Sequence, residues 1–210
     1  RKSDNAETGL NSNWITALLA LENGDLWVGT EEGLLYFDSR SEKFTQVHKE
    51  LNIEPTYISK ILPDGAGNLW VGTKSGLYFV SADKKVTSYK PVKGDPTSLS
   101  QENIFDLLLD SQNRLWVSTS RGGLDMMLPD KKSFRVFRND PKDPASISSD
   151  FLRKMILMPD GKILVGTSDR GFNVLDPATF TFTNFNHDPA NVHSLSSTSA
   201  FSFLLDSQKH

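Results

Sequence analysis

The chain is patterned as short apolar runs separated by polar turns, and the pattern recurs at a nearly fixed spacing. The clearest run, Gly67–Thr73, reads Gly-Asn-Leu-Trp-Val-Gly-Thr. Near copies occupy Gly24–Thr30, Asn113–Thr119 and Gly161–Thr167, the last with Leu164 in the tryptophan position. The closing threonines stand at positions 30, 73, 119 and 167, so one repeat is 43 to 48 residues long. Periods of this size are typical of repeat architectures, including β-propellers with four strands per blade.

Each repeat divides into four short apolar segments, as the first one illustrates. Ile15–Leu21 is a continuous apolar run, which predicts a strand covered on both faces. Leu26–Thr30, Leu34–Phe37 and Phe44–Val47 follow, joined by polar or glycine-containing turns that reverse the chain. Four strands with short turns form an antiparallel meander, so the sequence predicts an all-β chain built of four-stranded blades.

The spacing within each repeat sets the register of the first two strands. The apolar residue that opens the first segment (Ile15, Ile58, Ile104 or Leu152) always lies 15 residues before the motif threonine. Length changes therefore fall in the turns and in the connections between repeats. The predicted blades span approximately 14–47, 57–89, 103–137 and 151–185, and 200–210 reads as the start of a fifth repeat.

Composition narrows the class of protein. The chain has no cysteine, which excludes disulfides and thiolate metal sites, and its net charge of −3 argues against a nucleic-acid surface. No apolar run approaches the roughly 18 residues of a membrane span. The absence of a signal peptide and the first residue, Arg1, suggest a mature or excised piece of a longer protein.

The connections between repeats complete the pattern. Those at 93–100, 140–148 and 187–196 share an Asp-Pro start and a Ser-Leu/Ile-Ser end. The full pattern consists of an apolar first strand, Asp-x-x-Gly-Asn-Leu-Trp-Val-Gly-Thr, Gly-Gly-Leu, an aromatic-rich fourth strand and Asp-Pro-x-x-Ser-Leu-Ser. This pattern resembles the two-component regulator propeller repeat. The resemblance covers the chain apart from its first few residues.

This resemblance implies a function that periodicity alone does not. In that family the repeats form the periplasmic sensor of membrane-bound hybrid histidine kinases, often from gut Bacteroidetes. They build seven-bladed propellers, commonly two per sensor, followed by a small β-sandwich domain and a membrane span. The resemblance implies detection of glycan breakdown products and control of polysaccharide-use genes. The chain departs from the family in having too few repeats for a ring of seven, no sandwich domain, and Leu164 in place of a tryptophan.

The motif residues themselves favour packing over chemistry. Trp27, Trp70 and Trp116 could act as platforms for sugars, but a tryptophan repeated in every blade is expected to fill the space between neighbouring blades. The motif threonines are expected to satisfy local hydrogen bonds near the strand ends, because no general base is available to make one of them a nucleophile.

No metal or cofactor site is expected. The acidic turns at 64–67, 110–113 and 160–161 lack the alternating ligands of a calcium loop and read as hairpin turns. The histidines (His48, His187, His193 and His210) lack the spacing of metal ligands, although His187 and His193 share one connection.

The ligand-binding candidates follow from topology. In a meander blade, the turn after the second strand and the connection to the next blade lie on the same face, where binding residues are usually found. Arg121 and Arg170 in these turns could hold a carboxylate or sulfate bidentately, or they could be solvated turn residues. The remaining candidates are Lys74 in an equivalent turn and Trp14, Tyr57 and Phe151 just before first strands.

The sequence favours a non-catalytic, extracytoplasmic sensor propeller that binds a glycan-derived oligosaccharide. The alternatives are a propeller enzyme of the lactonase or lyase type and a protein-interaction platform. Among first strands, only Asp106 and Lys154 offer groups that catalysis could use, and they occupy the same register position. Four blades with unpaired ends predict an open fragment that associates with itself, while the parent protein is expected to be anchored in the inner membrane.

Overall fold

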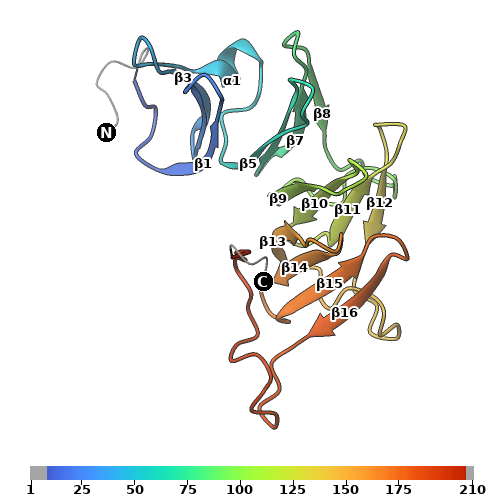
Figure 1. Cartoon of the computed structure of the whole chain (residues 1–210). Helices are drawn as coiled ribbons and strands as arrows, with labels where there is room; N and C mark the ends of the chain where they lie inside the picture. Colours follow the sequence, from blue (N-terminus) through green and yellow to red (C-terminus); the bar gives the residue numbers. More distant parts are fainter. Residues whose placement is uncertain (1–8, 207–210) are drawn as a thin grey trace. The chain divides into compact units, whose positions relative to one another are not determined.

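The structure, a computed structural model, describes residues 9–206 and consists of two compact units (Figure 1). The first unit contains the chain up to Tyr89 together with Glu102–Ile104. The second contains Lys90–Gln101 and the chain from Phe105 onward. Each unit carries two four-stranded sheets, so each can be described on its own. The part of the fifth repeat beyond position 206 and His210 lie outside the described residues.

Each repeat forms one antiparallel sheet whose strands follow sequence order, which confirms the prediction of four-stranded meander blades. The strands are well matched in length because the apolar segments have nearly the same length in every repeat. Their bounds are β1 Ile15–Ala20, β2 Leu26–Thr30, β3 Gly33–Asp38, β4 Lys43–Thr45, β5 Ile58–Pro63, β6 Leu69–Thr73, β7 Gly76–Val80, β8 Val86–Tyr89, β9 Ile104–Leu109, β10 Leu115–Thr119, β11 Leu124–Met127, β12 Phe134–Phe137, β13 Leu152–Leu157, β14 Ile163–Thr167, β15 Phe172–Asp176 and β16 Thr181–Phe185.

The constant 15-residue spacing does fix the register of the first two strands. Ile15 pairs with Thr30, Ile58 with Thr73, and Leu152 with Thr167. A bulge follows the first residue of each of these first strands. The extra residue lets these three first strands keep the same pairing at both ends of the hairpin despite the local kink.

The motif threonines lock the turn that follows the second strand. Each Oγ1 donates to the carbonyl of the glycine that opens or precedes the third strand, at 2.8–3.0 Å, and all four side chains are fully buried. Each Oγ1 also accepts a hydrogen bond from a backbone N–H of the turn. The expected local role of these threonines is confirmed, and it gives each blade a rigid turn on the same face.

The core of each unit lies between its two sheets. In the second unit Trp116 is fully buried and packs with residues of both β9–β12 and β13–β16. In the first unit Trp70 is buried, with its ring 4.6 Å from that of Phe79. Trp27 packs against the cluster between the two sheets but stays half-buried. The expected packing between blades is confirmed for Trp116 and, with incomplete burial, for Trp27. Trp70 is buried but lies outside the cluster between the two sheets of its unit.

The first strand of the first repeat is more exposed than its continuous apolar sequence predicts. Ala17 and Leu19 face the cluster between the two sheets, whereas Leu18 is 64% exposed and Ile15 38% exposed. Side chains alternate between the two faces of a strand. The prediction of a strand covered on both faces is therefore wrong for β1, because only one of its faces packs against a second sheet among the described residues.

The end of the first repeat also differs from the sequence prediction. Phe44–Val47 was expected to form the fourth strand, but β4 ends at Thr45 and Val47 begins the short helix α1, Val47–Glu50. The helix buries Val47 and His48, and His48 Nδ1 lies 3.0 Å from the carbonyl oxygen of Leu34. Burial of these two side chains against the first unit outweighs strand propensity at this point.

Two connections of the second unit are attached to fourth strands by equivalent backbone hydrogen bonds. The backbone N–H of Phe134 donates to the carbonyl of Thr97 at 2.7 Å, and that of Phe182 donates to Ala145 at 2.9 Å. The two donors occupy equivalent positions in successive repeats. Each connection therefore lies against the fourth strand of the blade whose first strand it leads into.

The residues after 196 follow the path of a first strand without forming one. The N–H of Gly171 donates to the carbonyl of Thr198, and the N–H of Ala200 donates to Thr167. Phe203 meets the ring of Phe172 edge-on at 5.9 Å. This segment thus covers part of the β13–β16 sheet, as expected of the start of a fifth repeat.

Candidate functional site

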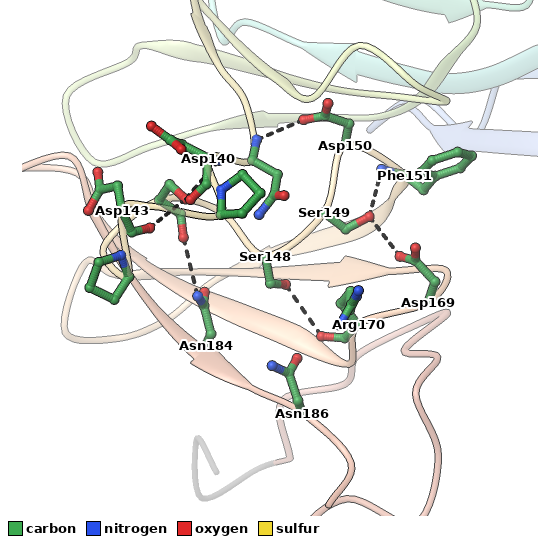
Figure 2. Close-up of a pocket in the computed structure, with 14 residues that line it drawn as sticks. Asp140, Asp143, Ser148, Ser149, Asp150, Phe151, Asp169, Arg170, Asn184 and Asn186 are labelled. Atoms are coloured by element: carbon green, nitrogen blue, oxygen red, sulfur yellow. Dashed lines mark hydrogen bonds between the residues drawn. The ribbon is translucent and has the colours of Figure 1, made fainter.

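The second unit contains an open cavity of about 430 Å³ on the face that carries its connections (Figure 2). Its size falls within the range of small-molecule sites. It is lined by the 139–151 connection, the turn after β14 and the last strand, β16. Its lining residues are Asn139, Asp140, Pro141, Asp143, Pro144, Ser146, Ser148, Ser149, Asp150, Phe151, Asp169, Arg170, Asn184 and Asn186.

The connection that forms one wall is rigid because its polar side chains hold its own backbone. Asp140 accepts the N–H of Lys142 at 2.9 Å, and Asp143 accepts that of Ala145 at 2.9 Å. The hydroxyl of Ser146 donates to the carbonyls of both aspartates. Aspartate and serine make such local bonds readily, so the Asp-Pro…Ser sequence folds this wall without help from a ligand.

A buried serine joins the connection to the turn after β14. Ser149 is only 5% exposed, and its Oγ accepts the N–H of Phe151 at 3.0 Å. The same hydroxyl donates to Asp169 Oδ1 at 2.7 Å (Figure 2). The carboxylate of Asp169 and the ring of Phe151, which is 41% exposed, are therefore held on the lining of one cavity.

Arg170 and Arg121 both lie near this cavity, but in different ways. The backbone of Arg170 is fixed by its N–H, which donates to Thr167 Oγ1 at 2.9 Å, while its exposed side chain lines the cavity. The guanidinium of Arg121 lies over the ring of Phe151, 5.4 Å from its centre. The structure thus gathers three of the sequence candidates, Arg121, Phe151 and Arg170, around one site.

The other sequence candidates lie in the first unit. Lys74 Nζ is placed 4.5 Å from the centre of the Tyr57 ring, so these two candidates contact each other. Trp14 is 63% exposed and lines a shallow depression together with Asn13, Ile15 and Glu31. The six candidates therefore fall into three groups, each at the start of a first strand.

Sequence reasoning missed the contribution of the fourth strand to the cavity. Asn184 lines it from β16, and its Nδ2 donates to the carbonyl of Ser146 at 3.2 Å. Asn139 contributes from the other end of the connection, where its Nδ2 donates to the carbonyl of Ile147. The only signal in the sequence is an amide side chain in an otherwise aromatic and hydroxylated fourth strand, which is too weak to point to a site.

The acidic turns serve the backbone, as the sequence predicts. Asp64 accepts the N–H groups of Ala66 and Asn68, and Asp110 accepts that of Gln112 and the indole N–H of Trp116. Residues 9–206 contain no group of three or more His, Cys, Asp or Glu side chains placed to hold a metal ion. Hairpin-turn bonding therefore accounts for these carboxylates.

Asp106 on β9 and Lys154 on β13, which occupy the same register position in their first strands, form an ion pair in the second unit. Lys154 Nζ lies 3.5 Å from Asp106 Oδ1, while Asp106 Oδ2 accepts the N–H of Met155 at 2.9 Å. Asp106 is only 2% exposed. Its carboxylate joins β9 to β13 and is shielded from solvent.

The fold identifies the class of protein as a β-propeller built from repeated four-stranded blades. Three segments, residues 9–32, 52–75 and 98–121, match the model of the two component regulator propeller family. No curated protein matches the sequence.

Solved structures share the fold at low sequence identity. The extracellular domain of the proposed hybrid two component system BT3049 from B. thetaiotaomicron is 22% identical, with a TM-score of 0.76 over 96% of this chain and 25% of its own. That of BT4673 from the same organism is 24% identical, with a TM-score of 0.72 over 94% of this chain and 25% of its own. Virginiamycin B lyase from Staphylococcus aureus is 10% identical, with a TM-score of 0.61 over 85% of this chain and 58% of its own. The chain therefore spans about a quarter of the length of the first two structures.

The four-residue helix α1 is far too short to cross a bilayer, and residues 9–206 hold no other helix that is long and apolar enough to do so.

Proposed function

We propose that this chain is part of the extracytoplasmic sensor propeller of a two-component signalling protein, a hybrid histidine kinase, and that it binds oligosaccharides released from polysaccharides. The family of the repeats supports the signalling role. The two similar structures from B. thetaiotaomicron are described as extracellular domains of such systems, which supports a place outside the cytoplasm. In this proposal the sensor region lies in the periplasm, and the parent protein is anchored in the inner membrane.

The observation that carries the ligand proposal is the cavity of the second unit. A saccharide presents hydroxyl groups at its edge and C–H groups on its ring face. The cavity offers carboxylate and amide groups (Asp169, Asn184 and Asn186) beside the partly exposed ring of Phe151. A few convergent polar groups around an aromatic surface are the usual composition of a small-molecule site. Arg170 adds a cation that can hold an acidic substituent.

We also propose that the chain is not a catalyst. In lactonase- or lyase-type propellers the reacting groups would be expected to lie on first strands near the axis. Here the only carboxylate on the first strands, Asp106, is buried, accepts a backbone N–H and pairs with Lys154. A carboxylate engaged in this way is poorly placed to abstract a proton from a substrate. Turnover of lactone or glycoside substrates that Asp106→Asn abolishes would contradict this part of the proposal.

A glycan array probed with the purified chain tests the ligand class. We expect binding to a limited group of oligosaccharides, and a complete lack of binding would overturn the proposed ligand. For an acidic saccharide that binds, Arg121→Ala and Arg170→Ala should each weaken affinity and leave the melting temperature nearly unchanged, because both side chains are exposed. Lys74→Ala tests the remaining cationic candidate in the same assay.

A further inference from the structure

The same arrangement of side chains occurs once in each unit. In the first repeat, Ser12 is 3% exposed, and its Oγ accepts the N–H of Trp14 at 3.0 Å. That hydroxyl donates to Glu31 Oε1 at 2.9 Å. In the fourth repeat Ser149 accepts the N–H of Phe151 and donates to Asp169. A buried serine therefore fixes an exposed aromatic ring and a turn carboxylate relative to each other in both places.

The other two complete repeats lack this arrangement. The residue two positions before Tyr57 is Pro55, which has no hydroxyl, and the turn residue Ser75 donates to Thr56 instead. In the third repeat the corresponding positions hold Gln101 and Asn103, so the aromatic ring is missing as well. The arrangement is thus a feature of the first and fourth repeats and is not required by the blade fold.

Each arrangement leaves the same two groups available to a ligand. Trp14 is 63% exposed and Phe151 is 41% exposed. One oxygen of each carboxylate is used by the serine, whereas Glu31 Oε2 and Asp169 Oδ2 accept no hydrogen bond from the described part of the chain. The aromatic ring and the carboxylate line one depression in each case. A ring face next to a free carboxylate oxygen matches a pyranose, with its apolar face and its hydroxyl edge.

We propose that the chain carries two equivalent saccharide subsites, one in each unit: Trp14 with Glu31, and Phe151 with Asp169. This inference rests on the proposed function, because it takes the ligand to be a saccharide. In each subsite one sugar ring stacks on the aromatic side chain, and one of its hydroxyls donates to the carboxylate. The serine does not touch the sugar and acts as a positioning residue.

The two subsites predict a definite stoichiometry. The probes are uncharged glucan tetrasaccharides with β-1,4, β-1,3 or α-1,4 linkages, titrated into the ¹⁵N-labelled chain and followed by NMR. At least one probe should shift two separate sets of resonances in a saturable way, those around Trp14 and Glu31 and those around Phe151 and Asp169. Uncharged probes are used so that Arg121 and Arg170 do not dominate the response.

Single substitutions should remove the two sets of shifts independently. Trp14→Ala should abolish the first set and leave the second, and Phe151→Ala should do the reverse. Glu31→Gln and Asp169→Asn keep the shape of the side chain but remove its charge, so each should weaken its own subsite about fivefold to tenfold. Tyr57→Ala is the matched control, because the second repeat has the aromatic residue without the serine-held carboxylate, and it should leave both sets unchanged.

Other outcomes would overturn the inference. It fails if only one set shifts, if Tyr57→Ala removes either set, or if no tetrasaccharide shifts either set. A glycan that binds on the array without moving either set would overturn the two subsites and leave the proposed sensor function standing. A lack of binding on the array together with no shifts would overturn both.

Discussion

Asp125 provides a sharp test of how burial shapes the stability of the second unit. Its side chain is fully buried in β11, where Oδ1 accepts the N–H of Ser100 at 3.0 Å and Oδ2 accepts the Ser100 hydroxyl. Burial raises the pKa of Asp125 from 3.8 to about 7, against the opposing effects of the Ser100 hydrogen bonds and the charge of Arg138. Asp125 thus holds the 93–100 connection through a carboxyl that is protonated below neutral pH.

The fourth repeat shows what a neutral residue does at this position. Asn173 is the equivalent of Asp125, is also fully buried, and accepts the N–H of Ser148 through Oδ1 at 2.9 Å. The amide therefore makes the same bond to the connection without a charge to bury. We expect Asp125→Asn to preserve the contact with Ser100, with the amide nitrogen donating to the hydroxyl.

The expected magnitude follows from the pKa shift. Between about pH 4 and pH 7 the folded chain keeps a proton on Asp125 that the unfolded chain releases, so the free energy of unfolding falls as the pH rises. The loss is fully present above pH 7 and absent below pH 4. A shift of one pKa unit corresponds to about 1.4 kcal/mol, so a shift from 3.8 to about 7 amounts to about 4 kcal/mol. Asp125→Asn should therefore match the wild type near pH 4 and be about 4 kcal/mol more stable near pH 8.

Urea unfolding followed by tryptophan fluorescence measures this difference, with Trp116 buried in the same unit as a reporter. The unfolding free energies of wild type and variant are compared at intervals between pH 4 and pH 8, so that the titration of other groups cancels. Asn173→Asp is the reciprocal control: it places a carboxylate at a fully buried position and should introduce a new loss of stability as the pH rises. Parallel stability curves for wild type and Asp125→Asn, or a variant less stable than wild type at pH 8, would refute the reasoning.

Three further predictions concern packing and assembly. Replacing Trp70 or Trp116 with alanine should reduce the unfolding free energy by about 3–5 kcal/mol, and replacing the half-buried Trp27 by less; a loss below about 1 kcal/mol for Trp116 in chemical denaturation would contradict its packing role. Gly123→Ala should strongly reduce the unfolding free energy, because an added Cβ would lie 2.2 Å from the carbonyl oxygen of Phe137 and the backbone φ is +84°. Gly65→Ala is the matched control: its φ is +80° but no atom lies within 4 Å of the added Cβ, so it should cost only the backbone strain of about 1 kcal/mol. If the self-association expected from the sequence occurs, light scattering on the purified chain should give a mass above 23.4 kDa, and a stable monomer at high concentration would contradict it.

Much of the fold could be predicted from the sequence because repetition averages out local ambiguity. One Leu-Trp-Val segment is compatible with several structures, but four copies in the same register define the strand, its turn and its partner. The 15-residue spacing therefore predicted pairs such as Ile58 with Thr73. It failed where a single repeat departs from the rest, as at Val47, which lies in α1 because burial of that helix outweighs the strand pattern.

For the candidate site, the sequence predicted which residues share a face but not the contacts between them. The meander topology predicted that Arg121, Phe151 and Arg170 lie on one face, because the turn after the second strand and the connection to the next blade lie at the same end of each sheet. The three residues do lie around one cavity of the second unit. It did not predict the bond between Ser149 and Asp169, which lie 20 residues apart and meet only through the path of the connection. Nor did it predict the fully buried state of Asp125, since an aspartate in a strand is ordinarily expected at the surface.

The sequence alone determined the number and order of the strands and the register of the first two strands in each repeat, since these depend on local periodicity and short turns. Tertiary structure alone decided which apolar faces are covered, which polar groups are buried and which side chains converge. These properties depend on contacts between repeats. The contrast between Leu18, exposed on β1, and Trp116, enclosed between two sheets, follows from what packs against each strand and cannot be read from either residue.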